Sequence, residues 1–82
     1  MNFWDGKKVL VTGGAGFIGS HTVDLLLSQA AGVLVTVPGR FSGRVPENLA
    51  AVASRVRLEE ADLRRPEDCA RACRGQDIVL NV

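Results

Sequence analysis

Short apolar runs and segments of helical periodicity alternate along the chain. Residues 8–12 and 33–37 are apolar and rich in β-branched side chains, which is typical of strands buried on both faces of a sheet. From Phe17, apolar residues recur at intervals of three and four. This pattern predicts a helix of about three to four turns that ends before Gly32. We expect Pro38-Gly39 to end the second strand.

The same alternation continues through the second half of the chain. Residues 47–54 carry a weak helical pattern, and residues 56–60 alternate like a strand. A further helix is predicted from Pro66, which suits a first helical turn, to about Arg74. Residues 77–82 form a last apolar strand. The order βαβαβαβ predicts an α/β fold with parallel strands, the first half of a Rossmann-like doubly wound sheet.

A glycine-rich segment, residues 13–19, joins the first predicted strand to the first predicted helix. Its glycines fit GxGxxG and the overlapping GxxGxxG. A pyrophosphate needs hydrogen-bond donors that approach without a Cβ in the way, and glycines at a helix N-terminus provide them. The alternative is a connector that has this spacing by chance. Dinucleotide binding is favoured because the segment follows a buried strand, opens a helix, and precedes a second strand that ends about 20 residues after Gly19.

Each residue type in this segment has a predicted part in binding a pyrophosphate. Gly13 makes the tight turn, Gly16 lets the backbone reach the phosphates, and Gly19 lets the helix pack close to the strand. The free N–H groups of Phe17 and Ile18 point at the ligand. Residues 1–82 are therefore predicted to form one dinucleotide-binding portion.

Residues 11–21 resemble the opening of the extended short-chain dehydrogenase/reductase family, the NAD(P)-dependent nucleotide-sugar epimerases, dehydratases and reductases. Their TGxxGxxG spacing is similar to that branch, whereas the TGxxxGxG of shorter members would need glycine in place of Phe17. Further segments resemble family landmarks in the same order: Ser42, 46–49, 61–63 and 75–81. The resemblance implies that the chain is the N-terminal, cofactor-binding part of an oxidoreductase or isomerase acting on a nucleotide sugar.

The end of the second strand bears on the choice of cofactor. In NAD-binding members an acidic residue there holds the ribose hydroxyls. This chain has Gly39 at that position, followed by Arg40. The loss of a carboxylate and gain of a guanidinium favour NADP(H), with NAD as the alternative, because arginine can bind a phosphate through two parallel charge-assisted bonds. Arg44 is placed to assist. The opposing interpretation is that Arg40 is only a solvated loop charge.

Two further positions gain a role through the resemblance. It implies that Asp62 accepts a hydrogen bond from the adenine amine and that Leu63 packs beside the ring. From the residues alone, Asp62 could equally cap the turn into the next helix. Asn81 borders the crevice expected for the nicotinamide half. His21, the one histidine, is predicted to pack or face solvent rather than to transfer protons.

The family's catalysis depends on a Tyr-x-x-x-Lys pair, and the chain contains no tyrosine. We therefore expect no catalytic residue and no substrate domain within residues 1–82. Nucleotide-sugar chemistry is expected only of a longer parent protein, with epimerase, dehydratase and reductase all open. The alternatives are a non-catalytic NAD(P)-binding sensor or structural module, and an interaction piece whose last strand pairs with another chain. A homodimer also stays open.

Composition narrows the remaining function classes. The net charge of +1 comes from scattered residues, so nucleic-acid binding is not expected. No apolar run approaches the roughly 20 residues of a membrane span, and no secretory signal is visible, so a cytoplasmic location is expected. Cys69 and Cys73 match neither a redox CxxC nor a zinc pattern, no other metal ligands are predicted, and both thiols are predicted to be buried.

Overall fold

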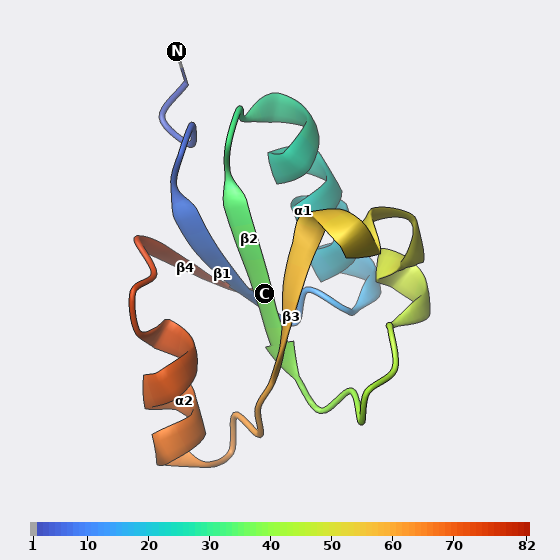
Figure 1. Ribbon diagram of the computed structural model, residues 1–82, viewed down its shortest axis with the longest axis vertical. Helices are drawn as coiled ribbons and strands as arrows, with labels where there is room; N and C mark the ends of the chain where they lie inside the picture. Colours follow the sequence, from blue (N-terminus) through green and yellow to red (C-terminus); the bar gives the residue numbers. More distant parts are fainter. Residues whose placement is uncertain (1) are drawn as a thin grey trace.

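The computed structural model describes residues 2–82 and shows a parallel four-stranded sheet (Figure 1). The elements in chain order are β1 (Lys8–Thr12), α1 (Phe17–Gln29), β2 (Leu34–Gly39), the 3-10 helix η1 (Glu47–Arg55), β3 (Val56–Glu60), α2 (Pro66–Cys73) and β4 (Ile78–Asn81). The strand order is β3-β2-β1-β4, and every neighbouring pair is parallel. This topology confirms the predicted α/β fold and is the first half of a Rossmann fold.

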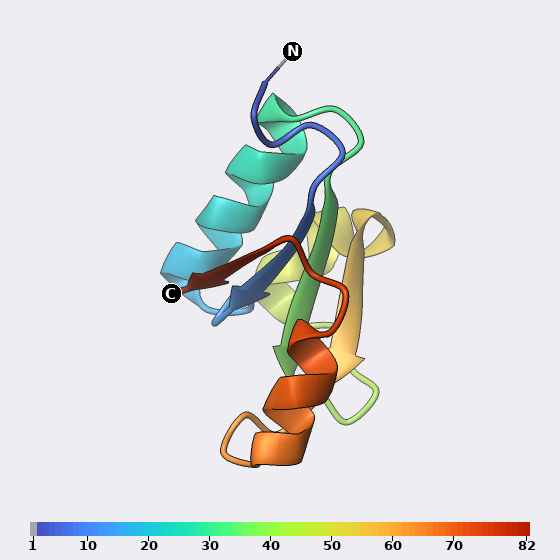
Figure 2. The ribbon, with the colours of Figure 1, turned by 90° about the vertical axis from the view of Figure 1, so that its left-hand side faces the viewer.

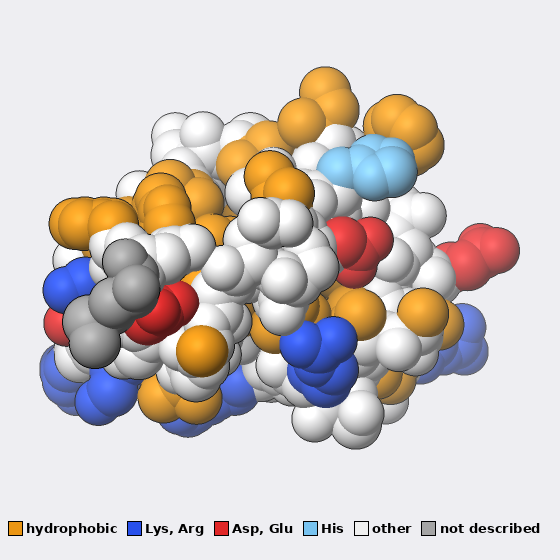
Figure 3. All heavy atoms as spheres, turned by 90° about the horizontal axis from the view of Figure 1, so that it is seen from above, with side chains coloured by type: hydrophobic (Ala, Val, Ile, Leu, Met, Phe, Trp, Pro, Cys, Tyr) orange, Lys and Arg blue, Asp and Glu red, His pale blue; other side chains and the backbone are white. Residues whose placement is uncertain are grey.

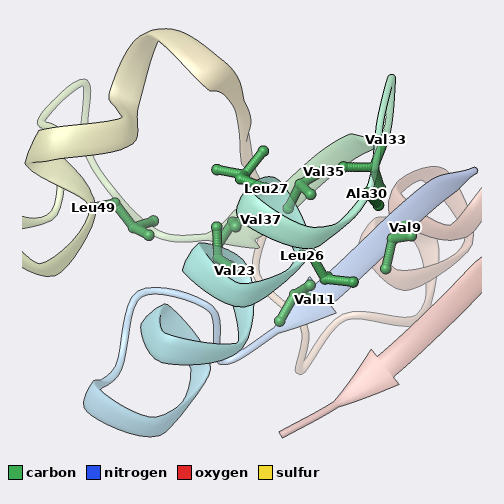
Figure 4. Close-up of a cluster of buried hydrophobic side chains, with 10 residues drawn as sticks. All are labelled: Val9, Val11, Val23, Leu26, Leu27, Ala30, Val33, Val35, Val37 and Leu49. Carbon is green, nitrogen blue, oxygen red and sulfur yellow. The ribbon is translucent and has the colours of Figure 1, made fainter. Parts of the chain in front are cut away.

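The hydrophobic core lies between the sheet and α1 (Figure 4). Alternate residues of a strand point to the same face, so Val9 and Val11 of β1 and Val35 and Val37 of β2 all face α1. The side chains that meet them come from α1, from the connection to β2 and from η1: Val23, Leu26, Leu27, Ala30, Val33 and Leu49. Helix α2 reaches past the lower ends of the strands (Figure 2).

Because all four strands run the same way, the loops that follow them meet at one edge of the sheet. In Figure 1 this edge is the lower one, where the turn after β1 and the loop after β2 lie. The turn after β3 reaches the same edge, because Gly39 and Glu60 are register partners at the ends of β2 and β3. In doubly wound sheets ligands bind outside this carboxyl edge.

Strand β2 runs through Pro38 and Gly39, whereas the sequence predicted that it ends before them. The Gly39 carbonyl accepts a hydrogen bond of 2.9 Å from the Ala61 N–H, so the backbone of Gly39 faces β3. The backbone of Pro38 must then face β1, since successive residues of a strand alternate. The pairing of β1 with β2 ends at Leu10 and Thr36, before Pro38, so the missing N–H of proline breaks no sheet hydrogen bond.

Segment η1 is a 3-10 helix rather than the weak α-helix that the sequence indicated. It begins with a hydrogen bond of 3.0 Å from the Leu49 N–H to the Pro46 carbonyl, which is an i to i−3 bond. Leu49 is buried and Val52 is half-buried, and their spacing of three residues matches one 3-10 turn.

The prediction that both thiols are buried is wrong for Cys73, which is exposed, while Cys69 is half-buried. The Cys69 thiol donates a hydrogen bond of 3.1 Å to the Leu63 carbonyl. Helix α2 buries only Ala72, so most of its surface faces solvent. None of the helices formed by residues 2–82 has the length and apolar character needed to cross a lipid bilayer.

Candidate functional site

The turn after β1 reverses the chain through glycine. Gly13 has φ +72°, a left-handed conformation that disfavours residues with a Cβ. Two backbone hydrogen bonds fix the turn, from the Gly14 N–H to the Val11 carbonyl (3.2 Å) and from the Gly16 N–H to the Gly13 carbonyl (3.0 Å). A Cβ on Gly13 would also lie 2.6 Å from the Val82 carbonyl oxygen. The chain can make this turn only with glycine at position 13.

Gly19 allows α1 to lie directly against the turn. A Cβ on Gly19 would overlap the Gly13 carbonyl oxygen and lie 2.8 Å from Cα of Gly14. Gly16 differs, because a Cβ added to it would lie 3.4 Å from its nearest neighbour, the Gly13 carbonyl oxygen, which is an ordinary contact. Gly16 is exposed, so its lack of a side chain leaves open space outside the helix. The structure thus contains both the tight turn and the close packing that the sequence predicted.

The N-terminus of α1 offers backbone donors to a ligand. Gly16 is the N-cap residue and has no capping side chain, and the first turn of α1 contains no acidic residue. The Gly16 carbonyl accepts the Ser20 N–H at 2.8 Å. Within residues 2–82 no such bond engages the N–H groups of Phe17 or Ile18. These donors and the positive end of the helix dipole favour an anion at this point.

The side chains of Phe17 and Ile18 are exposed, at 71% and 69% of their maximum. The Phe17 ring contacts the His21 ring edge to face, with centroids 4.6 Å apart. The space-filling view shows the histidine in pale blue on the surface beside hydrophobic side chains (Figure 3). His21 therefore packs on an aromatic ring and faces solvent, as predicted for it.

An open groove joins the glycine turn to the loop after β2. Its volume is about 430 Å³, and it is lined by Ala15 of the turn and by Arg40, Phe41, Arg44, Val45 and Pro46 of the loop. The two arginines predicted to act on the cofactor are therefore brought to one hollow beside the turn. Another hollow of about 420 Å³ lies near the amino ends of the strands, around Lys8 and Arg57, and contains no residue of the turn.

Asp62 lies just beyond β3, and its carboxylate is already hydrogen-bonded. Arg64 donates to it from Nε (3.0 Å), Nη2 (2.9 Å) and its backbone N–H (3.0 Å). These hydrogen bonds from the Arg64 side chain and then its backbone hold the pKa of Asp62 well below its ordinary value, and the charge of Arg40 adds a smaller effect in the same direction. These hydrogen bonds match the alternative in which Asp62 shapes the turn into α2. Asp62 also lies at the carboxyl edge of the sheet, which is the position that the adenine role needs. Leu63 beside it is 37% exposed.

We predict that Asp62→Asn weakens the acid sensitivity of the fold. Because the folded-state pKa of Asp62 is depressed, its carboxylate stabilises the fold above the unfolded pKa near 3.8 and loses that effect as the pH falls below it. Thermal unfolding at about pH 6 and about pH 3 should show a smaller drop in Tm for the variant than for wild type. Asp24→Asn, on the exposed surface of α1, is the control. An equal drop in wild type and in Asp62→Asn would contradict the prediction.

The structure adds residues that the sequence interpretation gave no part in the site. Asn48 Nδ2 donates a hydrogen bond of 3.1 Å to the Ala15 carbonyl, which ties η1 to the glycine turn. Glu60 accepts hydrogen bonds from the loop after β2.

Thr12 donates from Oγ1 to Oδ1 of Asn81 at 2.7 Å, so Asn81 does lie at the carboxyl edge. No group of metal-ligating side chains suited to an ion occurs in the described part of the chain.

Comparisons with known proteins agree with this geometry. Residues 9–82 match the model of the "NAD dependent epimerase/dehydratase family". UDP-glucose 4-epimerase 3 of Oryza sativa subsp. japonica is 40% identical over 86 residues, which covers 93% of this chain and 22% of the relative. Human UDP-glucose 4-epimerase is 46% identical over 67 residues, which covers 70% of this chain and 19% of the relative. The chain thus spans about a fifth of the length of these curated relatives.

Solved structures give the same result. An epimerase from Methanothermobacter thermautotrophicus superposes with a TM-score of 0.76 at 30% identity, covering 96% of this chain and 23% of that one. A short-chain dehydrogenase/reductase from Veillonella parvula in complex with NADP gives a TM-score of 0.68 at 25% identity, covering 92% of this chain and 34% of that one. Binding of NAD(P) by this chain fits the matched family and the NADP complex of that solved structure. By sequence and by fold, the chain belongs to the NAD dependent epimerase/dehydratase family.

Proposed function

We propose that the chain binds NADP(H) through the glycine turn, with NAD as the weaker alternative. The observation that carries this proposal is the groove that joins Ala15 of the turn to Arg40 and Arg44. A dinucleotide whose pyrophosphate lies at the N-terminus of α1 has its adenosine ribose directed toward the end of β2. A 2′-phosphate there would meet two guanidinium groups and no carboxylate on the groove surface.

Each predicted site residue takes one part in this proposal. Gly13, Gly16 and Gly19 shape the backbone, and the N–H groups of Phe17 and Ile18 donate to the pyrophosphate. Arg40 binds the 2′-phosphate. Asp62 and Leu63 lie by the adenine, with the Asp62 carboxylate shared between Arg64 and the adenine amine. The bound nicotinamide would supply hydride transfer.

For a longer protein that contains this chain, we propose chemistry on a nucleotide sugar. The support is the similarity to UDP-glucose 4-epimerases and to a UDP-glucuronic acid decarboxylase from Arabidopsis thaliana, which is 46% identical over 52 residues. Residues 1–82 would supply the cofactor half only, since they contain no tyrosine to serve as the acid/base. The second candidate, a non-catalytic NAD(P)-binding module, is compatible with the same absence.

Titration of the 82-residue chain with NADPH and with NADH tests cofactor binding. We expect saturable binding of both by calorimetry, tighter for NADPH, with amide NMR shifts at Gly13 to Gly19 and at Arg40. No saturable signal with either nucleotide would refute the proposal. Equal affinities would leave binding in place and remove the preference for NADP(H). Activity toward UDP-sugars is expected only from a longer protein, and its absence there would favour the non-catalytic module.

Arg40→Ala is expected to weaken NADPH binding by about tenfold or more and to change NADH binding little, because a charge-assisted hydrogen bond contributes about 1.5–3 kcal/mol. Arg74→Ala is the matched control, since Arg74 is an exposed arginine beyond α2 and far from the groove in the chain. The measurement is the ratio of the two Kd values by calorimetry. An unchanged ratio in Arg40→Ala would count against a 2′-phosphate contact.

A further inference from the structure

The loop after β2 contains a tight turn that places both arginines. Ser42 and Gly43 have φ values of +53° and +77°, and the Arg44 N–H donates to the Phe41 carbonyl at 3.0 Å. Two central residues with positive φ are the mark of a type I′ turn. Because this turn reverses the chain, Arg40 and Arg44 stand on its two sides and both line the groove.

A single carboxylate oxygen holds the beginning of this turn. Oε1 of Glu60 accepts hydrogen bonds from the N–H of Phe41 (3.1 Å) and from the N–H of Ser42 (3.0 Å). Glu60 is the last residue of β3 and the register partner of Gly39. The last backbone hydrogen bond that links these segments runs from the Ala61 N–H to the Gly39 carbonyl. The two hydrogen bonds to the Glu60 side chain continue this link into the loop after β2.

The same loop geometry leaves no room for a side chain at position 39, where NAD-binding relatives are expected to carry an acidic residue. A Cβ on Gly39 would lie 2.7 Å from Cζ of the Phe41 ring and 2.8 Å from its Cε1. The ring of Phe41, which is half-buried, thus lies against the glycine. Any side chain at position 39 would have to displace the ring, and the ring's place depends on the backbone that Glu60 holds.

We propose that Glu60 is a positioning residue that sets the selectivity for NADP(H) over NAD(H). By accepting both amides, it keeps the Phe41 ring over Gly39 and keeps Arg40 and Arg44 at the groove. This inference rests on the proposed function. Glu60 acts through geometry and not through charge, because a negative charge near a bound 2′-phosphate would by itself oppose binding.

Two substitutions separate geometry from charge. Glu60→Ala removes the charge and the acceptor, whereas Glu60→Gln removes the charge and keeps an acceptor oxygen. If Glu60 positions the loop, Glu60→Ala weakens NADPH binding by about tenfold and changes NADH binding by less than about twofold, while Glu60→Gln retains the wild-type ratio. If Glu60 acted only as a repulsive charge, both variants would bind NADPH more tightly than wild type.

The experiment combines calorimetry with amide hydrogen exchange by NMR on the 82-residue chain. Glu67→Ala is the control, since Glu67 is an exposed carboxylate on α2 that pairs with Arg65. We expect faster exchange at Phe41 and Ser42 in Glu60→Ala alone, together with the lower NADPH preference. An unchanged ratio of NADPH to NADH affinity in Glu60→Ala, or a tighter NADPH complex in both Glu60 variants, overturns this inference. If wild type still binds NADPH more tightly than NADH, the proposed function stands in either case. Absence of binding by wild type overturns both.

Discussion

The Gly19→Ala variant is expected to have a free energy of unfolding about 3 kcal/mol below that of wild type, the upper range for overpacking a close contact. The added Cβ would overlap the Gly13 carbonyl oxygen and crowd Cα of Gly14. Both neighbours are backbone atoms, so they cannot rotate away as the end of a flexible side chain could. Helix α1 would have to move away from the turn, and its N-terminal donors would move with it.

The measurement is thermal unfolding followed by circular dichroism, in which about 3 kcal/mol corresponds to a drop in Tm of roughly 12–24 °C for a domain of this size. NADPH affinity should fall as well. Gly16→Ala is the matched control, because its Cβ finds only an ordinary contact at 3.4 Å. Because Gly16 is the N-cap of α1, the variant should lose no more than about 1 kcal/mol of stability, and it should still lose NADPH affinity. Equal destabilisation by both variants would show that close packing at Gly19 is not the cause.

Leu49→Ala is expected to cost about 3 kcal/mol of stability, because truncation of a fully buried leucine removes apolar burial and leaves a cavity. Leu49 is the only buried residue of η1 and is 0% exposed. Its neighbour Asn48 carries the hydrogen bond to the Ala15 carbonyl. Loss of the Leu49 contact should therefore loosen the glycine turn and weaken NADPH binding.

Urea denaturation of Leu49→Ala measures this cost, and Leu25→Ala provides the comparison. Leu25 lies on α1 and is 62% exposed, so its truncation should change stability by no more than about 0.5 kcal/mol. If Leu49→Ala unfolds at the wild-type urea concentration, η1 is not held by this side chain. If stability falls but NADPH affinity does not, the link from η1 to the glycine turn is refuted.

The parts of the fold that the sequence predicts well are those with a local physical cause. The apolar, β-branched run 8–12 matches β1, and the periodic segment from Phe17 matches α1. Gly75, expected to stop the last helix, has φ +79°. The glycine spacing likewise indicates the turn, because a tight reversal followed by close helix packing requires glycine at fixed positions.

Other parts of the site depend on contacts that no local pattern contains. Glu59 and Glu60 are the same residue type, but successive side chains of a strand point to opposite faces of the sheet. The side chain of Glu60 therefore reaches the amides of the loop after β2. The pairing of Asp62 with Arg64 depends on side-chain conformation, so the sequence left two roles open for Asp62. The exposure of Cys73 follows from the narrow contact surface of α2, which periodicity alone does not reveal.

The strand order has a consequence for how the chain folds. Strand β1 lies between β2 and β4, and its register partners on β4 begin with Ile78. Strand β1 therefore gains its second neighbour only after β4 has been synthesised. Parallel pairing between such distant segments makes folding slow relative to helical proteins of equal length. Gly13, which lies close to the Val82 carbonyl, would then reach its final surroundings in a late step, so a chain synthesised only as far as β3 would lack the finished glycine turn.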